Sequence, residues 1–182
     1  HIPSLPYGEA PAFFVWLKTQ HSASARALQF LILTAARTSE VRFARFDELE
    51  SDTWVLAPER TKTGHEHRIP LSTQAAELVA EQQARMSGAV IFPNESGKPL
   101  SDAAMAAFLK RDGYDARPHG FRATFRTWVE EMTDTPYEVK ETALGHRVDT
   151  KVVQAYQRSD RLEKRRVLMQ AWADYLNGVS AV

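Results

Sequence analysis

The stretch ASARALQFLILTAARTSE, residues 23–40, indicates the centre of the fold. Apolar side chains recur at positions 28, 31, 32 and 35, which is the spacing of one helical face, and others at 30 and 33 cover further faces. A helix that is apolar on nearly every side is usually buried. We therefore predict a central helix over residues 23–36.

The rest of the chain predicts a mainly α fold with a small antiparallel β-sheet (α+β). Two stretches are typical of short strands joined by a hairpin loop, residues 53–57 and 67–71, and Gly64 lies near the tip of that loop. Residues 90–92 predict a third short strand. Further helices are predicted at 9–20, directly after Arg37, and at 73–86, 102–112, 119–132, 136–145, 151–157 and 161–176.

Capping residues predict several helix boundaries. Ser72 and Ser101 are suited to cap the helices that follow them. The sequence TPYE, residues 135–138, combines a capping box with a proline suited to the first helical position. Gly145 is typical of a helix C-terminus. On the 119–132 helix, the apolar face is expected to include Met132.

The composition of the 182-residue chain fits one domain, with 43% hydrophobic and 25% charged residues. There is no cysteine, which excludes disulfides, cysteine nucleophiles and thiolate metal ligands. The longest apolar run, residues 27–36, is too short to span a bilayer, so we expect no membrane partner. Because the chain begins with His1, we expect it to be part of a longer protein.

The net charge of zero, from 23 basic and 23 acidic residues, is unusual for a dedicated DNA-binding domain. The distribution of charge is uneven, however. Residues 110–126 and residues 158–166 each hold five basic and two acidic side chains, whereas acidic residues gather at 47–52. A neutral total is therefore compatible with one basic face that binds nucleic acid.

Two arginines lie close to predicted helix ends. Arg37 directly follows the central helix, where a charge is costly unless it is paired, and Glu40 is placed to pair with it. His119 and Arg122 are three residues apart at a helix start, so they share a face near backbone N–H groups that favour phosphate. Taken alone, the first pair is most simply a structural salt bridge, and the second is equally a capping histidine beside a surface arginine.

The hairpin loop carries Lys62, which alone is most simply a solvated lysine. His65 and His67 on the same hairpin form an H-x-H pair that could suggest zinc, but no third ligand lies nearby. Tyr156 alone is most simply an amphipathic packing residue.

The set of residues is more informative than any member, because together they could perform phosphodiester transesterification. A tyrosine hydroxyl, with an ordinary pKa near 10, needs a base, and a histidine can accept its proton. Arginines bind the non-bridging oxygens of phosphate in bidentate fashion, and a lysine can protonate the leaving oxygen. Such a site needs no metal ion, because fixed cations supply the positive charge.

The order and spacing of these residues resemble the catalytic domain of the tyrosine recombinases, the phage integrase family. LILTAARTSEVR (31–42) resembles the first arginine box, ERTKTGHEHRIPL (59–71) the hairpin of the catalytic lysine, and PHGFRATFRTW (118–128) the H-x-x-R box. ALGH (143–146) resembles the second histidine box, with AY (155–156) ten residues later. The closing RRVLMQAWADYL (165–176) resembles integrases of prophages and genomic islands.

The resemblance implies a DNA breaking–rejoining fold and a set of site residues. The implied catalytic residues are Arg37, Lys62, His119, Arg122, His146 and the nucleophile Tyr156, supported by Glu40. Tyr156 would form a 3′-phosphotyrosine and free a 5′-hydroxyl, without metal or ATP. The arginines and His146 would stabilise the phosphorane, His119 would act as base and Lys62 as acid. Arg126 and Arg158 are DNA-binding candidates.

The resemblance also implies partners and a setting. Residues 1–182 would be one C-terminal catalytic domain, with N-terminal core-binding and arm-binding domains absent from this chain. The full-length protein would recombine double-stranded DNA attachment sites as a homotetramer, with an excisionase or a host DNA-bending protein as accessory partner. We expect it in the bacterial cytoplasm, at the nucleoid.

Three alternatives to an integrase share parts of this pattern. A type IB topoisomerase shares the chemistry, but the short loops and the integrase-like end argue against it. A non-catalytic DNA-binding or regulatory module would be expected to have a decayed site, and none of the six positions is altered. A metal-dependent nuclease would need clustered carboxylates at metal-ligand spacing, which the sequence lacks.

Overall fold

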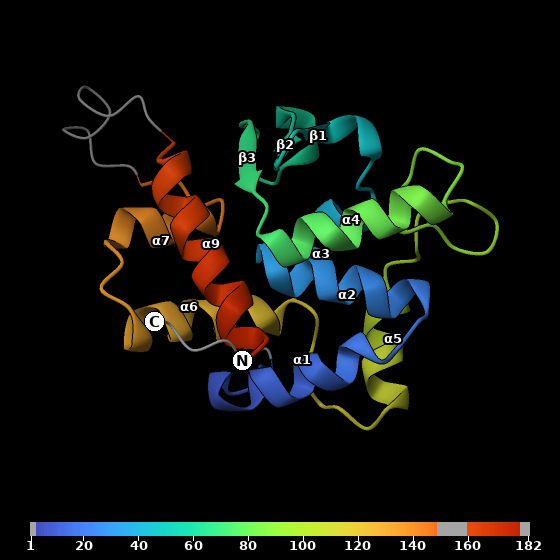
Figure 1. Cartoon of the computed structure of the whole chain (residues 1–182), viewed down its shortest axis with the longest axis horizontal. Helices are drawn as coiled ribbons and strands as arrows, with labels where there is room; N and C mark the ends of the chain where they lie inside the picture. The colour runs from blue at the N-terminus through green and yellow to red at the C-terminus, as the bar shows by residue number, and fades with distance from the viewer. Residues whose placement is uncertain (1–2, 149–159, 179–182) are drawn as a thin grey trace.

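The computed structural model describes residues 3–148 and 160–178, and in this part helices surround α2 (Figure 1). The α-helices are α1 (Ala10–Lys18), α2 (Ala23–Thr34), α3 (Thr38–Arg42), α4 (Thr73–Arg85), α5 (Ala104–Arg111), α6 (Gly120–Met132), α7 (Tyr137–Ala143) and α9 (Leu162–Leu176). The short 3-10 helices are η1 (Tyr7–Glu9), η2 (Phe46–Glu48) and η3 (Pro58–Arg60). The strands are β1 (Leu49–Glu50), β2 (Thr53–Leu56) and β3 (His67–Pro70).

Helix α2 is the predicted central helix, and its place is confirmed. It packs against α1, α3, α4, α5, α6 and α9, and nearly all of its residues from position 25 onward are buried. The Ser22 hydroxyl caps it by accepting a hydrogen bond from the Ala25 N–H at 3.1 Å. The helix ends at Thr34, and the C-cap residue Ala35 has a left-handed φ of 51°. That turn redirects the chain, and Arg37 becomes the N-cap residue of α3.

The antiparallel sheet has the strand order β1-β2-β3. Trp54 of β2 packs the sheet against α2. Trp54 faces Ile69 across the β2–β3 pair and is fully buried, with its ring 5.0 Å from that of Phe30 in α2. The hairpin of β2 and β3 is as predicted. The third strand is not at 90–92: β1 takes that place, and Val90 forms only an isolated bridge with Arg45.

The prediction of a strand at residues 90–92 is wrong for a simple physical reason. Ile91 and Phe92 are fully buried and fill the core, and their apolar character does not require a ladder of strand partners. The backbone of Ile91 is satisfied by other groups, since its N–H donates to Ala44 at 2.9 Å and its carbonyl accepts from Gln82 Nε2 at 2.7 Å.

The predicted helix caps are partly confirmed. The Ser72 hydroxyl caps α4 through the Ala75 N–H at 3.2 Å, and Gly145 follows α7 with a φ of 66°. The Ser101 cap is wrong, because α5 begins later, at Ala104, whose N–H bonds the Ser101 backbone carbonyl at 3.2 Å instead of the hydroxyl.

Two further expectations around the end of α6 are also wrong. Pro136 is the N-cap of α7 and not its first residue, and no side-chain cap bond forms there. The Thr135 hydroxyl instead accepts a hydrogen bond from Thr133 at 2.8 Å. Met132, at the last position of α6, is 55% exposed, because the neighbouring elements do not cover the end of that helix.

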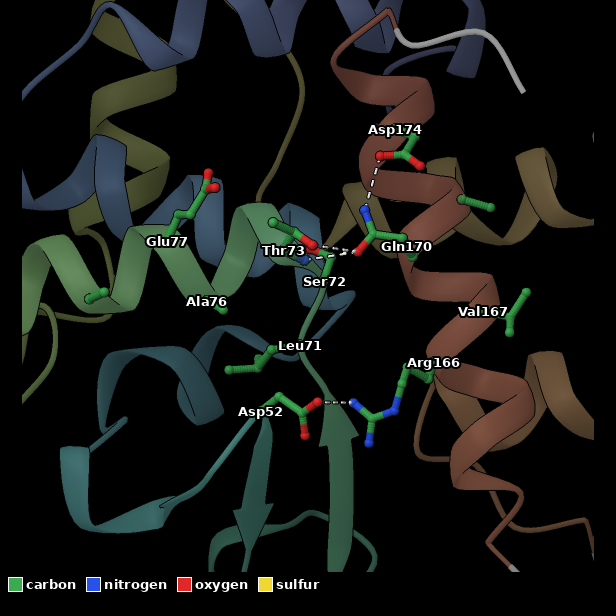
Figure 2. A pocket seen from close by; sticks show the side chains of 12 residues that line it. Asp52, Leu71, Ser72, Thr73, Ala76, Glu77, Arg166, Val167, Gln170 and Asp174 are labelled. Atoms are coloured by element: carbon green, nitrogen blue, oxygen red, sulfur yellow. Dashed lines mark hydrogen bonds and ion pairs between the residues drawn. The ribbon is translucent and has the colours of Figure 1, made fainter. Parts of the chain in front are cut away.

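Helix α9 holds the fold together by packing against elements from both halves of the chain (Figure 1). Trp172 is fully buried and donates from Nε1 to the Ile32 carbonyl at 2.8 Å. On another face, Gln170 accepts from the Thr73 N–H at 2.8 Å and Arg166 pairs with Asp52 at 3.0 Å (Figure 2). The residues that make these contacts line a cavity of about 850 Å³ between α4 and α9. In the part of the chain that is described, no helix combines the length and apolar character needed to cross a membrane.

Candidate active site

Five of the six predicted catalytic residues line one cavity of about 280 Å³, together with the DNA-binding candidate Arg126. These five are Arg37, Lys62, His119, Arg122 and His146. They come from the start of α3, the β2–β3 loop, the start of α6 and the turn after α7. The predicted nucleophile Tyr156, the candidate Arg158 and the helix expected at 151–157 lie outside the described residues.

Arg122 is the buried centre of the cavity wall, with only 7% of its surface exposed. Its Nη1 donates to the Ala35 carbonyl at 2.5 Å and its Nη2 to the Leu144 carbonyl at 2.7 Å. Burial, and then the nearby charge of Arg37, lower the pKa of Arg122 to about 10, which leaves it charged at neutral pH. A surface arginine, which the sequence allowed at this position, is therefore excluded. The guanidinium ties the turn after α2 to the turn after α7.

Arg37 is fixed by the carboxylate of Glu40, as the sequence predicts. Glu40 accepts from the Arg37 backbone N–H at 2.8 Å and from Arg37 Nη1 at 3.1 Å. Glu40 is 1% exposed, so the carboxylate is buried behind the arginine and not in the cavity mouth. A second arginine, Arg60, donates to the Glu40 backbone carbonyl at 3.0 Å and links α3 to the hairpin.

His119 is the N-cap residue of α6, although its side chain makes no capping bond. Burial lowers the pKa of His119, and the positive charges of Arg122, Arg37 and Lys62 lower it further. A histidine with a lowered pKa is largely neutral at neutral pH and can accept a proton. The close approach of Pro3 requires the following residue, Gly120, to be glycine, because a Cβ would overlap the Pro3 backbone carbonyl.

Lys62 reaches the cavity from an exposed loop. The loop is closed by hydrogen bonds from the Thr61 hydroxyl to the His65 carbonyl at 2.8 Å and from the Gly64 N–H to the Thr61 carbonyl at 3.3 Å. Gly64 has a φ of 69°, which is the turn conformation that the sequence predicts. Lys62 therefore meets the arginines across the cavity, from an element that is otherwise exposed to solvent.

His146 is held by Glu141, which sequence reasoning missed. The Glu141 carboxylate lies 2.8 Å from His146 Nδ1 and 3.2 Å from Arg126 Nη2, and its side chain is 7% exposed. The opposite ring nitrogen, Nε2, lies 3.5 Å from Arg122 Nη2. The available signal was the glycine cap: it folds the chain back so that the His146 N–H bonds the Glu141 carbonyl at 2.9 Å, which brings positions 141 and 146 together.

His67 packs behind the cavity against the same turn. A Cβ added to Gly145 would lie 3.2 Å from Arg37 Nη1 and 3.3 Å from His67 Nε2, so the backbone approaches both side chains closely. Burial, followed by the charges of Arg165, Arg37 and Arg122, lowers the pKa of His67 to about 3. The ring is therefore neutral at neutral pH, and it fills the space between the arginines without adding charge.

The basic cluster predicted at 158–166 is partly structural. Arg165 is 1% exposed, and its Nε donates to the Asp160 carbonyl at 2.7 Å. Burial lowers the pKa of Arg165 to about 10. The Asp160 carboxylate receives two 2.7 Å hydrogen bonds from Arg68 in β3. Burial alone would raise the pKa of Asp160, but the Arg68 bonds and the Arg165 charge hold it below its ordinary value. Arg165 is thus neither solvated nor placed to bind DNA.

The H-x-H pair contacts other protein groups. His65 Nε2 lies 2.8 Å from Arg147 Nη1, and His67 lies against Gly145. Within residues 3–148 and 160–178, no three side chains of the histidine, aspartate or glutamate type are grouped as metal ligands would be.

The sequence is similar to integrases. The sequence profile of the phage integrase family matches residues 8–163. The prophage integrase IntZ of Escherichia coli strain K12 is 36% identical over 188 residues, a match that covers 100% of this chain and 46% of that protein. The chain spans about half the length of the curated relatives it matches.

The fold is similar to that of lambda integrase. Its catalytic core matches with a TM-score of 0.61 at 18% identity, over 81% of this chain and 94% of that one. A lambda integrase tetramer bound to a Holliday junction matches with a TM-score of 0.62 at 16% identity, over 82% of this chain and 48% of that one. The predicted fold class, mainly helical with a small antiparallel sheet in the manner of a recombinase catalytic domain, is confirmed.

Proposed function

Because this chain belongs to the phage integrase family, we propose that it is the catalytic domain of a site-specific DNA recombinase that integrates or excises a prophage or genomic island. The observation that carries the proposal is the cavity, where Arg37, Lys62, Arg122 and two histidines converge from four separate segments of the chain. A structural salt bridge or a solvated lysine would not need this convergence. The chemistry that suits it best is attack on a DNA phosphodiester.

The electrostatics of the cavity suit the pentacovalent transition state at phosphorus. Negative charge concentrates there on the non-bridging oxygens, and donors that are fixed in advance stabilise it without reorganising. Arg122 is held by two carbonyls and Arg37 by Glu40, so both guanidiniums are in place before substrate arrives. His146, beside Arg122, would provide a third contact to the same oxygens. These fixed cations supply the charge, and we propose that the step uses neither a metal ion nor ATP.

The two proton transfers are assigned to the remaining side chains. Tyr156 would attack the scissile phosphate, forming a 3′-phosphotyrosine bond as the bond to the 5′-oxygen breaks. His119, whose lowered pKa keeps it neutral, would accept the phenolic proton. Lys62 would give a proton to the departing 5′-oxygen. Attack by the 5′-hydroxyl of another strand reverses the step and releases Tyr156, so the energy of the phosphodiester bond is conserved.

The whole protein's architecture and partners are extrapolated from the family. We propose that residues 1–182 are a C-terminal catalytic domain and that core-binding and arm-binding domains belong to the same protein. A tetramer on paired DNA sites is supported by the neighbour described as a tetramer bound to a Holliday junction. Arg126 and Arg158 would contact DNA, an excisionase or DNA-bending protein would assist, and the protein would act in the bacterial cytoplasm at the nucleoid.

A covalent-trapping experiment tests the proposal. The chain and its Tyr156→Phe variant are incubated, in EDTA, with nicked suicide duplexes from the end of the element that encodes it. Denaturing electrophoresis then separates protein joined to DNA from free protein. A covalent band with the parent and none with the variant is expected. DNA binding on a native gel without a covalent band would favour a non-catalytic DNA-binding module.

A further inference from the structure

We propose that Glu141 is a positioning residue that sets which nitrogen of His146 faces the cavity, an inference that rests on the proposed function. Glu141 lies in the last turn of α7 and His146 in the turn that follows the helix, with the Glu141 carboxylate 2.8 Å from His146 Nδ1. A carboxylate oxygen without a proton only accepts hydrogen bonds, so at this distance Nδ1 carries the hydrogen. Nε2 is then the nitrogen left for the cavity, on the side of Arg122.

The chemical consequence is a fixed orientation in both charge states of the ring. In neutral His146, Nε2 would be a hydrogen-bond acceptor, and in the imidazolium it would be a donor to a phosphate oxygen. In either state the Nδ1 proton stays on the side of Glu141. Glu141 does not line the cavity, so its carboxylate supports the ring from behind.

Burial supports this role. The Glu141 side chain is 7% exposed, and a carboxylate is costly to bury unless it is paired. Oε2 faces His146, whereas Oε1 makes no hydrogen bond in the described part of the chain and is compensated by the charge of Arg126 in α6, whose Nη2 lies 3.2 Å away. Arg126 therefore offsets the cost of the buried charge. A glutamate that served only to solubilise α7 would point to solvent.

Helix α7 also provides a matched control. Lys140 and Glu130 form a second ion pair between α6 and α7, in which the Glu130 side chain is 63% exposed. Neither residue lines the cavity. Removing Glu130 thus breaks a link between the same two helices without touching His146, and it separates a loss of helix packing from a loss of ring orientation.

The test combines ring NMR with cleavage. In protein labelled with 15N in histidine, and with the His146 signals assigned from a His146→Gln variant, Nε2 and not Nδ1 should lose its proton as the pH rises. In Glu141→Ala, the proton should be lost from either nitrogen of His146. The same variant should cleave DNA covalently about 10- to 100-fold more slowly at saturating DNA. Glu141→Gln keeps an oxygen acceptor, so it should preserve the Nδ1–H form and slow cleavage less. Glu130→Ala should change neither measurement.

Each result decides the matter. If the His146 nitrogens titrate alike in the parent and in Glu141→Ala, Glu141 does not position the ring and the inference is overturned. The same holds if Glu141→Ala cleaves at the parental rate. If the parent itself forms no covalent band, the proposed function fails, but the NMR comparison still shows whether Glu141 sets the orientation of His146.

Discussion

The two sides of the cavity are built differently. On the arginine side, Arg122 and Arg37 are largely buried and hydrogen-bonded to backbone carbonyls or to Glu40. On the lysine side, Lys62 projects from the exposed β2–β3 loop. Groups that stabilise developing charge act best when their positions are fixed, whereas a proton donor can be brought to the leaving oxygen from a loop. We therefore expect the arginine side to couple activity to folding, and the lysine side to affect chemistry alone.

Replacing the buried guanidinium should have the largest effect. Arg122→Lys cannot bond both the Ala35 and Leu144 carbonyls, so the free energy of unfolding should fall by about 3 kcal/mol. Covalent cleavage should slow by about 10³-fold or more. Urea unfolding and the rate of adduct formation measure the two losses. Arg126→Lys, at a side chain that is 50% exposed, is the control and should change stability by less than about 0.5 kcal/mol. If the Arg122→Lys protein is as stable as the parent, the arginine side of the cavity does not couple activity to folding.

The neutral histidine behind the arginines makes stability depend on pH. The pKa of His67 is lowered from 6.5 to about 3 in the fold, so the unfolded chain binds a proton first as the pH falls. Stability present above pH 6.5 is therefore lost as the pH falls toward 3. The free energy of unfolding of the parent should therefore fall between roughly pH 8 and pH 5. In His67→Gln, that fall should be smaller by about 1–2 kcal/mol, after allowance for partial solvent screening. Parallel curves for the two proteins in urea unfolding across that range would show that His67 is not held neutral.

Two glycines with nearly the same backbone conformation compare the two sides directly. Gly145 has a φ of 66° and lies against Arg37 and His67, whereas Gly64 has a φ of 69° and a Cβ added to it would meet nothing within 4 Å. Each change to alanine should cost about 1 kcal/mol for the left-handed backbone. Gly145→Ala should cost about 1 kcal/mol more, because the arginine side cannot move aside. If Gly145→Ala and Gly64→Ala lose equal free energy of unfolding, measured by heat or urea, the turn at Gly145 adapts to a Cβ as easily as the loop at Gly64.

The lysine should have the smallest effect on the fold. Lys62→Met should leave the free energy of unfolding within about 0.5 kcal/mol of the parent and yet slow cleavage by about 10²-fold. A substrate with a bridging 5′-sulfur should restore the rate, because a thiolate leaves without needing a proton. If the sulfur substrate is cleaved as slowly as the oxygen substrate, Lys62 is not the proton donor.

The sequence predicts which residues meet at the cavity better than it predicts what supports them. Arg37, Lys62, His119, Arg122 and His146 are singled out by the resemblance to a recombinase catalytic domain, and they do line one cavity. Their supports depend on contacts between distant segments, which spacing does not encode. The Ala35 carbonyl that binds Arg122 is 87 positions away in sequence.

The same limit explains the errors in the fold. The central helix was predictable because its apolar pattern is long and continuous. The two-residue strand β1 has no pattern of its own and exists only because β2 lies beside it. Similarly, the sequence does not distinguish Arg165 from the other basic residues near it. Only the structure shows that Arg165 is buried beside Asp160.

The central claim, that Tyr156 is the nucleophile of this cavity, can be tested by identifying the amino acid that is joined to DNA. Trypsin cuts after Lys151 and Arg158, and the peptide between them, VVQAYQR, contains one hydroxyl side chain, that of Tyr156. After cleavage of suicide DNA and nuclease digestion, mass spectrometry should find this peptide carrying a 3′-linked nucleotide. A nucleotide on any other peptide, or an unmodified VVQAYQR in the covalent complex, would contradict the account.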